Sequence, residues 1–160
     1  ILPAIALFQQ KAIKMEKRIQ IDQVEPNSYK GMFALEKYLH SSEITPSHIH
    51  LIKMRASQIN GCAYCIDMHS KEAIKDGEST QRLLLLDAWR ETDLFSKQEQ
   101  IILQVTEEVT LIHTHGLSSE TYEKALSILG ENYLAQVIMA GVTINAWNRI
   151  AISTHKPIPA

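Results

Sequence analysis

The stretch INGCAYCIDMHSKEA, residues 59–73, contains the only two cysteines of the 160-residue chain. Cys62 and Cys65 are separated by two residues, and His69 follows four residues after the second cysteine. An Asn-Gly pair stands directly before the cysteines, and glycine readily adopts the left-handed conformation that ends a helix. The stretch therefore predicts one helix that ends at the Asn-Gly pair and a second helix with the C-x-x-C at its N-terminus.

The segments on both sides of this stretch predict further helices and no strand. Apolar residues recur every three to four positions along most of the chain, which is typical of helices. Thr45 followed by Pro46 is typical of a helix N-terminus, and Ser96 with Glu99 forms the S-x-x-E pattern of a capping box. The expected helices span residues 26–43, 46–60, 62–76, 80–91, 97–115, 119–129 and 132–153. The sequence thus predicts an all-α fold.

Composition excludes several classes of protein. Sixteen basic and 18 acidic residues give a net charge of -2, and no basic block is present, so we expect no nucleic-acid partner. The longest aliphatic run, Leu83–Leu86, is far shorter than the roughly 18 residues that predict a membrane span, so we expect no membrane partner. Two close cysteines without a secretory signal indicate redox or metal chemistry in a reducing compartment. We therefore expect a cytoplasmic protein.

The chain is expected to form one domain. Its length suits a single core, and we place the domain at residues 15–156, with a tail at 157–160. The composition changes at Met15, so we interpret residues 1–14 as an extension or tag before the natural start. The alternative is a genuine arm that docks on a neighbouring subunit.

The C-x-x-C and the histidine are the strongest candidates for chemistry. On a helix, Cys62, Cys65 and His69 share one face because they stand at positions i, i+3 and i+7. The positive end of the helix dipole lowers the pKa of a thiol in the first turn, and a nearby imidazole can accept its proton. A thiolate attacks peroxides or disulfides, and a second thiol can resolve the resulting sulfenic acid. This pattern favours redox catalysis by the two thiols.

Two other interpretations remain open for the cysteines. They could bind zinc together with His69, with a fourth ligand from His48-x-His50 or His113-x-His115. They could also be inert residues of the core, because free cysteine is often buried. We expect His48, His113 and His115 to be structural or exposed.

Residues 50–73, HLIKMRASQINGCAYCIDMHSKEA, resemble the AhpD-like alkylhydroperoxidases of the carboxymuconolactone decarboxylase family. The resemblance continues through GESTQRLLLLDAWRE (77–91), FSKQEQIILQVTEEVT (95–110) and INAWNR (144–149), and spans about residues 15–152. It implies a compact all-helical subunit that assembles as a trimer or hexamer, often with the active site near a subunit interface. It also implies that no bound cofactor is required.

The resemblance further implies a role for each site residue. Cys65 would be the thiol that reacts with peroxide, Cys62 its proton donor and resolving partner, and His69 a member of the proton relay. A hydroperoxide would be the substrate, and a lipoyl-bearing or thioredoxin-like protein the reductant.

The chain departs from the family pattern at one relay position. The pattern places a glutamate twelve residues before the first cysteine, where this chain has His50. Some relatives also have a histidine where this chain has Tyr64. A neutral His50 can accept a proton, but it cannot hold a fixed negative charge beside an imidazole. His50 therefore either rewires the relay, leaves it weaker, or replaces an idle glutamate.

Three hypotheses for function follow. The leading one is a dithiol peroxidase that reduces alkyl hydroperoxides or hydrogen peroxide through a Cys62–Cys65 disulfide. The second is a decarboxylase of a lactone acid, against which the C-x-x-C argues. The third is a non-enzymatic thiol redox sensor or a zinc-binding oligomer. Asn145 and Asn148, polar residues on an apolar helix, predict a buried hydrogen bond or a polar pocket wall.

Overall fold

A computed structural model describes residues 16–159, and over this range the chain forms helices and no strand. The elements are α1 (Ile21–Val24), α2 (Pro26–His40), α3 (Pro46–Asn60), α4 (Ala63–Lys75), α5 (Thr80–Leu85), the 3₁₀ helix η1 (Leu86–Glu91), α6 (Lys97–Thr110), α7 (Ile112–His115), α8 (Ser119–Leu129) and α9 (Glu131–Ser153). The predicted all-α fold is confirmed. The proposed extension, residues 1–14, lies outside the described residues. Within them, no helix has the length and apolar character needed to cross a membrane.

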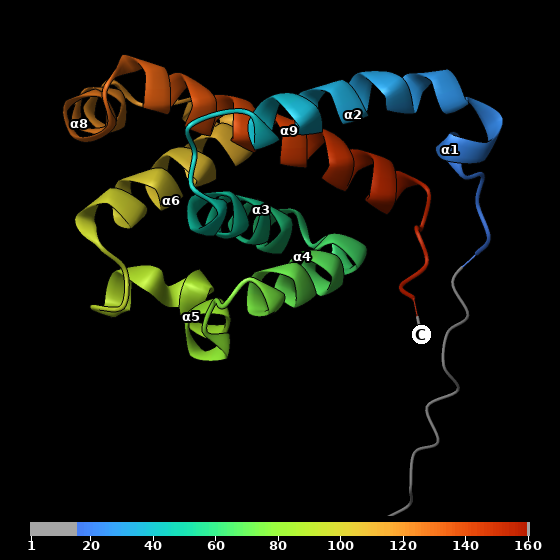
Figure 1. Cartoon of the computed structure of the whole chain (residues 1–160), viewed down its shortest axis with the longest axis horizontal. Coiled ribbons are helices and arrows are strands. Elements are labelled where there is room, and N and C mark those ends of the chain that lie inside the picture. Colours follow the sequence, from blue (N-terminus) through green and yellow to red (C-terminus); the bar gives the residue numbers. More distant parts are fainter. Residues whose placement is uncertain (1–15, 160) are drawn as a thin grey trace, which may run out of the picture.

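Helix α3 is the centre of the fold. Every residue from His48 to Ser57 is buried, and α3 packs against α4, α6 and α9. In Figure 1, α3 lies between α2 and α4, with α9 running along the same side as α2. Ile52 and Ala56 join one apolar cluster with α6 and α9, whereas Leu51 and Met54 join a second cluster with α5 and η1. The buried helix thus holds the surrounding helices in fixed positions.

Local capping chemistry sets both ends of α3. The Thr45 hydroxyl accepts a hydrogen bond from the His48 N–H at 3.3 Å, as the sequence predicts. Gly61 ends the helix with φ +67°, and the Cys62 N–H then donates to the Ser57 carbonyl at 3.0 Å, which closes a Schellman-type turn. The short connection folds α4 back along α3, so the N-terminus of α4 lies beside the C-terminus of α3.

The helix that carries the C-x-x-C begins one residue later than predicted. Helix α4 starts at Ala63, and Cys62 is its N-cap. The Cys62 sulfur accepts the Cys65 N–H at 3.4 Å, so the sulfur takes the place of the capping oxygen that Ser or Asp normally supplies.

The helix predicted over 80–91 is divided. Helix α5 ends at Leu85, and η1 contains a break at Ala88 with φ −108° and ψ 27°. Ser79 stands at the N-cap position but makes no side-chain cap. The indole N–H of Trp89 donates to Glu107 on α6 at 2.9 Å, and this long-range contact accompanies the departure from regular helix.

The helix predicted over 97–115 is also divided. Helix α6 ends at Thr110, and the backbone turns at Leu111 before the short α7. The Thr114 hydroxyl donates to the Leu111 carbonyl at 2.8 Å, which competes with regular helical bonding. Glu108 accepts the Ser118 N–H at 2.7 Å and so draws the following segment back onto α6.

Candidate active site

One face of the fold is hollowed beside the dithiol. Helices α2, α3, α4 and α9 line an open cavity of about 970 Å³. Cys65, His69 and His50 all lie on its wall, whereas Cys62 does not. The structure therefore brings three of the four predicted site residues to one cavity and places the fourth directly behind it.

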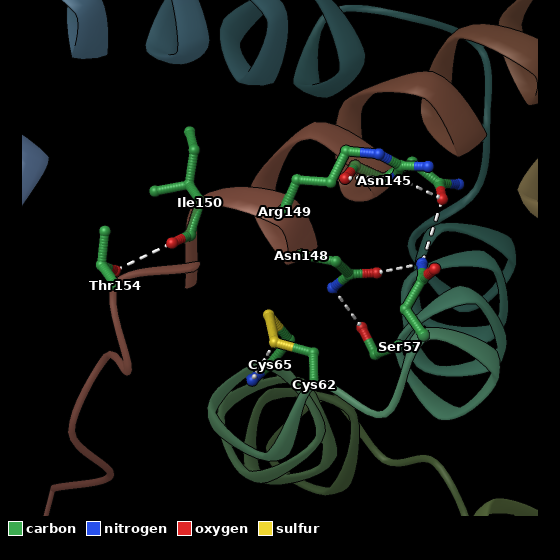
Figure 2. Close-up of a disulfide and its surroundings, with 9 residues drawn as sticks. Ser57, Cys62, Cys65, Asn145, Asn148, Arg149, Ile150 and Thr154 are labelled. Carbon is green, nitrogen blue, oxygen red and sulfur yellow. Dashed lines mark hydrogen bonds between the residues drawn. A yellow bond between two sulfur atoms is a disulfide. The ribbon is translucent and has the colours of Figure 1, made fainter. Parts of the chain in front are cut away.

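The two cysteines form a disulfide at the start of α4. Their Cα atoms are 5.3 Å apart, and the residues are 1% and 2% exposed. Figure 2 shows the disulfide facing α9, where Ala151 packs against both cysteines. Both sulfurs lie at the helix N-terminus, where free N–H groups and the helix dipole stabilise a thiolate.

An amide network fixes the segment that precedes the cysteines. The Asn148 side chain donates to the Ser57 hydroxyl at 3.1 Å, and Asn60 donates to the side-chain oxygens of Asn148 and Asn145 at 2.8 and 3.0 Å. Figure 2 shows these contacts between α9 and the end of α3. Asn148 is fully buried, so the predicted buried hydrogen bonds of Asn145 and Asn148 are confirmed. The network ties α9 to the turn that carries Cys62.

His69 forms a hydrogen-bonded pair with Glu72, which our sequence analysis did not identify. The His69 Nδ1 atom lies 2.8 Å from a Glu72 carboxylate oxygen, and His69 is only 3% exposed. The hydrogen bond from His69 lowers the pKa of Glu72 despite partial burial, and the nearby Lys53 and His50 add to this effect. An ionised carboxylate only accepts, so Nδ1 carries a proton, and in the neutral ring Nε2 is an acceptor. The i, i+3 spacing of the two residues was the signal available in the sequence.

His50, which stands where the family pattern has a glutamate, has a carboxylate partner of its own. Its Nε2 atom lies 2.8 Å from Asp76 at the end of α4. His50 is 8% exposed, and its Nδ1 atom is buried with no hydrogen-bond partner among residues 16–159. His50 and Asp76 also line a second, smaller cavity of about 360 Å³. The pair therefore lines both cavities.

Helix α2 also contributes a carboxylate to the wall of the main cavity. Glu36 accepts hydrogen bonds from Lys53 at 2.8 Å and from the Trp147 indole at 2.9 Å. Trp147 also packs against Tyr29 and Phe33, with ring centroids 5.2 and 5.9 Å apart. These contacts join α2 to α3 and α9 and give the cavity an aromatic wall. No sequence pattern identified Glu36 as part of this cavity.

Three other histidines, His48, His113 and His115, do not line the cavity beside the dithiol. His48 is buried, and its Nδ1 atom lies 2.6 Å from the Tyr133 hydroxyl; burial lowers its pKa. His113 and His115 are exposed on α7. Across the part of the chain that the structure describes, no three His, Cys, Asp or Glu side chains are grouped as a metal site would require. Tyr64 lies on the cavity wall.

Comparison with known proteins identifies the family. The model of the carboxymuconolactone decarboxylase family matches residues 26–108. The uncharacterized protein YdfG of Bacillus subtilis is 38% identical over 139 residues, which cover 87% of this chain and 95% of YdfG. The chain belongs to the carboxymuconolactone decarboxylase family.

Solved structures place it among the AhpD-like members. A crystal structure from Agrobacterium tumefaciens is 37% identical with a TM-score of 0.87, and covers 91% of this chain and 99% of its own. It is described as a protein of unknown function proposed as an antioxidant defence protein, AhpD. A debrominase solved with 2,3,4-tribromopyrrole has the same fold at 16% identity, with a TM-score of 0.77 over 86% of this chain and 74% of its own. The AhpD-like fold and family are therefore shown, and the fold is also present in an enzyme of different chemistry.

Proposed function

We propose that the protein is a dithiol peroxidase that reduces hydroperoxides through the Cys62–Cys65 pair. The observation that carries this proposal is the disulfide at a helix N-terminus on the edge of a cavity, with a carboxylate-paired histidine on the same helix face. The structural likeness to a protein with a proposed antioxidant role supports the same class of reaction.

The first chemical step is peroxide cleavage at Cys65. His69 accepts the Cys65 proton at Nε2, and the thiolate attacks one peroxide oxygen. The O–O bond breaks, a sulfenic acid forms on Cys65, and the departing alkoxide takes the proton from His69 and leaves as an alcohol. Cys65 lies on the cavity wall and Cys62 does not, which supports the order of reaction that the family resemblance implies.

The second step closes the disulfide. The Cys62 thiol attacks the sulfur of the Cys65 sulfenic acid, the S–O bond breaks, and the oxygen leaves as water with the Cys62 proton. An external dithiol then reduces the disulfide by thiol exchange and is itself oxidised. We expect a lipoyl-bearing or thioredoxin-like protein in this role, and a trimer or hexamer as the assembly.

Consumption of cumene hydroperoxide in the presence of a dithiol reductant tests the proposal. We expect steady turnover by the wild type and none by Cys65→Ser. Cys62→Ser should retain one stoichiometric oxidation, because Cys65 still reacts but no disulfide closes. Absence of turnover by the wild type, with both thiols titratable after reduction, would refute the peroxidase and favour thiol exchange or redox sensing.

A further inference from the structure

The cavity beside the dithiol has two chemically different ends. Helix α4 runs antiparallel to α3, so Cys65 lies near Ala151 at one end, and His50 meets Asp76 at the other. Helix α2 spans both ends, since Tyr29 and Phe33 contact Trp147 and Glu36 contacts Lys53 further along. Lys75 is ten residues beyond Cys65 on α4, a helical rise of roughly 15 Å. The cavity is therefore long enough for an extended molecule.

The wall near the dithiol is apolar. Tyr29, Phe33 and Trp147 form a continuous aromatic surface, and Met68 and Ile150 also line the cavity. Phe33 is 60% exposed, although it belongs to this aromatic cluster. A cavity of about 970 Å³ greatly exceeds the size of hydrogen peroxide and falls in the range of sites for larger ligands. The reacting end thus suits a substrate with a large apolar body.

All acidic side chains on the cavity wall have a basic partner, but two lysines on the wall have no acidic partner among residues 16–159. Every acidic side chain on the cavity wall has a partner: Asp22 with Lys156, Glu36 with Lys53, Glu72 with His69, and Asp76 with His50. Lys37 and Lys75 also line the cavity, and neither forms an ion pair or side-chain hydrogen bond within residues 16–159. Lys37 follows Glu36 on α2, and Lys75 precedes Asp76 on α4. Both therefore lie toward the end that His50 marks, and the cavity offers two unneutralised positive charges there.

We infer that the preferred substrate is an amphipathic hydroperoxide with a terminal carboxylate, of the long-chain fatty-acid type. Its peroxide group reaches Cys65, its apolar chain packs on the aromatic wall, and its carboxylate lies between Lys37 and Lys75. Exposed ion pairs are individually weak, so the two lysines supply only part of the binding free energy. Their effect is to favour a charged hydroperoxide over an uncharged one with a similar apolar body. This inference rests on the proposed peroxidase function.

A comparison of an acid with its ester tests the lysines. The substrates are linoleic acid hydroperoxide and its methyl ester, which differ in charge and share the apolar body. We expect the wild type to favour the acid by about fivefold in kcat/KM, from two weak exposed ion pairs. The ratio should approach unity in Lys37→Met/Lys75→Met and should fall in the wild type as salt is raised.

The matched control is Lys30→Met/Lys71→Met. It removes one lysine from α2 and one from α4, with the same change in net charge, and neither residue lines the cavity. We expect it to keep the wild-type acid-to-ester ratio. An acid-to-ester ratio of one in the wild type, or a ratio that survives in Lys37→Met/Lys75→Met, would overturn the inference.

Calorimetric binding separates this inference from the peroxidase itself. Dodecanoate and methyl dodecanoate carry no peroxide, so titration of each into the resting protein requires no turnover. We expect tighter binding of dodecanoate, with the difference lost in Lys37→Met/Lys75→Met. If no hydroperoxide is consumed but this difference is present, the peroxidase is refuted and the carboxylate subsite stands. Equal binding of the two compounds would overturn the subsite.

Discussion

The family pattern places a glutamate before the cysteines, where this chain has His50. Replacement of Glu72 by glutamine tests whether Glu72, on α4, supplies the missing carboxylate instead. The glutamine side-chain oxygen can still accept the His69 Nδ1–H, so the orientation of the ring is preserved and only the negative charge is lost. A hydrogen bond to a charged group contributes about 1.5–3 kcal/mol, but the Glu72 side chain is 51% exposed. Solvent screening therefore reduces the expected effect to roughly 1 kcal/mol, which is about a fivefold change in rate.

The expected result is a lower kcat/KM for peroxide on the plateau of its pH profile. The ionised Glu72 stabilises the imidazolium that forms when His69 takes the Cys65 proton, so its loss makes the thiolate harder to form. Alkylation of the reduced protein by iodoacetamide, measured against pH, should show the same loss of rate without any peroxide. It thereby separates thiol ionisation from peroxide chemistry.

Asp67→Asn is the matched control for Glu72→Gln. Asp67 is an acidic residue on the same helix, paired with Lys71 at 2.8 Å, and it does not line the cavity. Its replacement should leave both pH profiles where they are. Coincident profiles for Glu72→Gln and the wild type would show that Glu72 has no role in thiolate formation.

Three predictions concern stability, measured as the free energy of unfolding in urea. Gly61→Ala should cost about 1 kcal/mol because φ is +67°, whereas Gly31→Ala, inside α2 with open space around it, should stabilise by up to about 1 kcal/mol; equal effects would contradict the capping role. Asn148→Ala should cost about 2 kcal/mol, because it leaves buried hydrogen-bond partners unsatisfied, and a negligible loss would show that the network is dispensable. Burial acts to raise the pKa of Glu99, but hydrogen bonds from Arg82 and Ser96 more than offset it, so the pKa lies below its ordinary value of 4.5. Because the pKa of Glu99 is depressed in the folded protein, its stabilisation is complete above pH 4.5 and is lost as the pH falls through the lower folded-state pKa. Glu99→Gln should therefore reduce the loss of unfolding free energy at acid pH. An unchanged loss would contradict the assignment to Glu99.

The parts of the fold that the sequence predicted are those set by neighbouring residues. Thr45 caps α3 through an N–H three residues away, and Ser96 with Glu99 closes a capping box within one turn. The break at Ala88 was not predicted, because the Trp89–Glu107 bond that accompanies it joins residues far apart in the sequence. Local patterns carry no information about such contacts.

The same distinction applies to the candidate site. Cys65 and His69 fall on one face because helical periodicity places them there. The contact of Glu72 with His69 could have been predicted from the same periodicity. Glu36 and Trp147 come from α2 and α9, so only the tertiary fold brings them to the cavity. Likewise, His50 pairs with Asp76 across a separation of 26 residues. The shared helix face of Cys65 and His69 was thus predictable, whereas the groups that surround them were not.

The N-cap position of Cys62 has a consequence for regeneration of the dithiol. Cys65 is the cysteine that lines the cavity, so in the proposed cycle an incoming thiolate from a reductant would attack the Cys65 sulfur and expel Cys62. The expelled sulfur is already the acceptor of the Cys65 N–H, and stabilisation of the anion makes it a better leaving group. In the proposed cycle, the helix end that would activate the pair toward an oxidant would thus also ease its reduction.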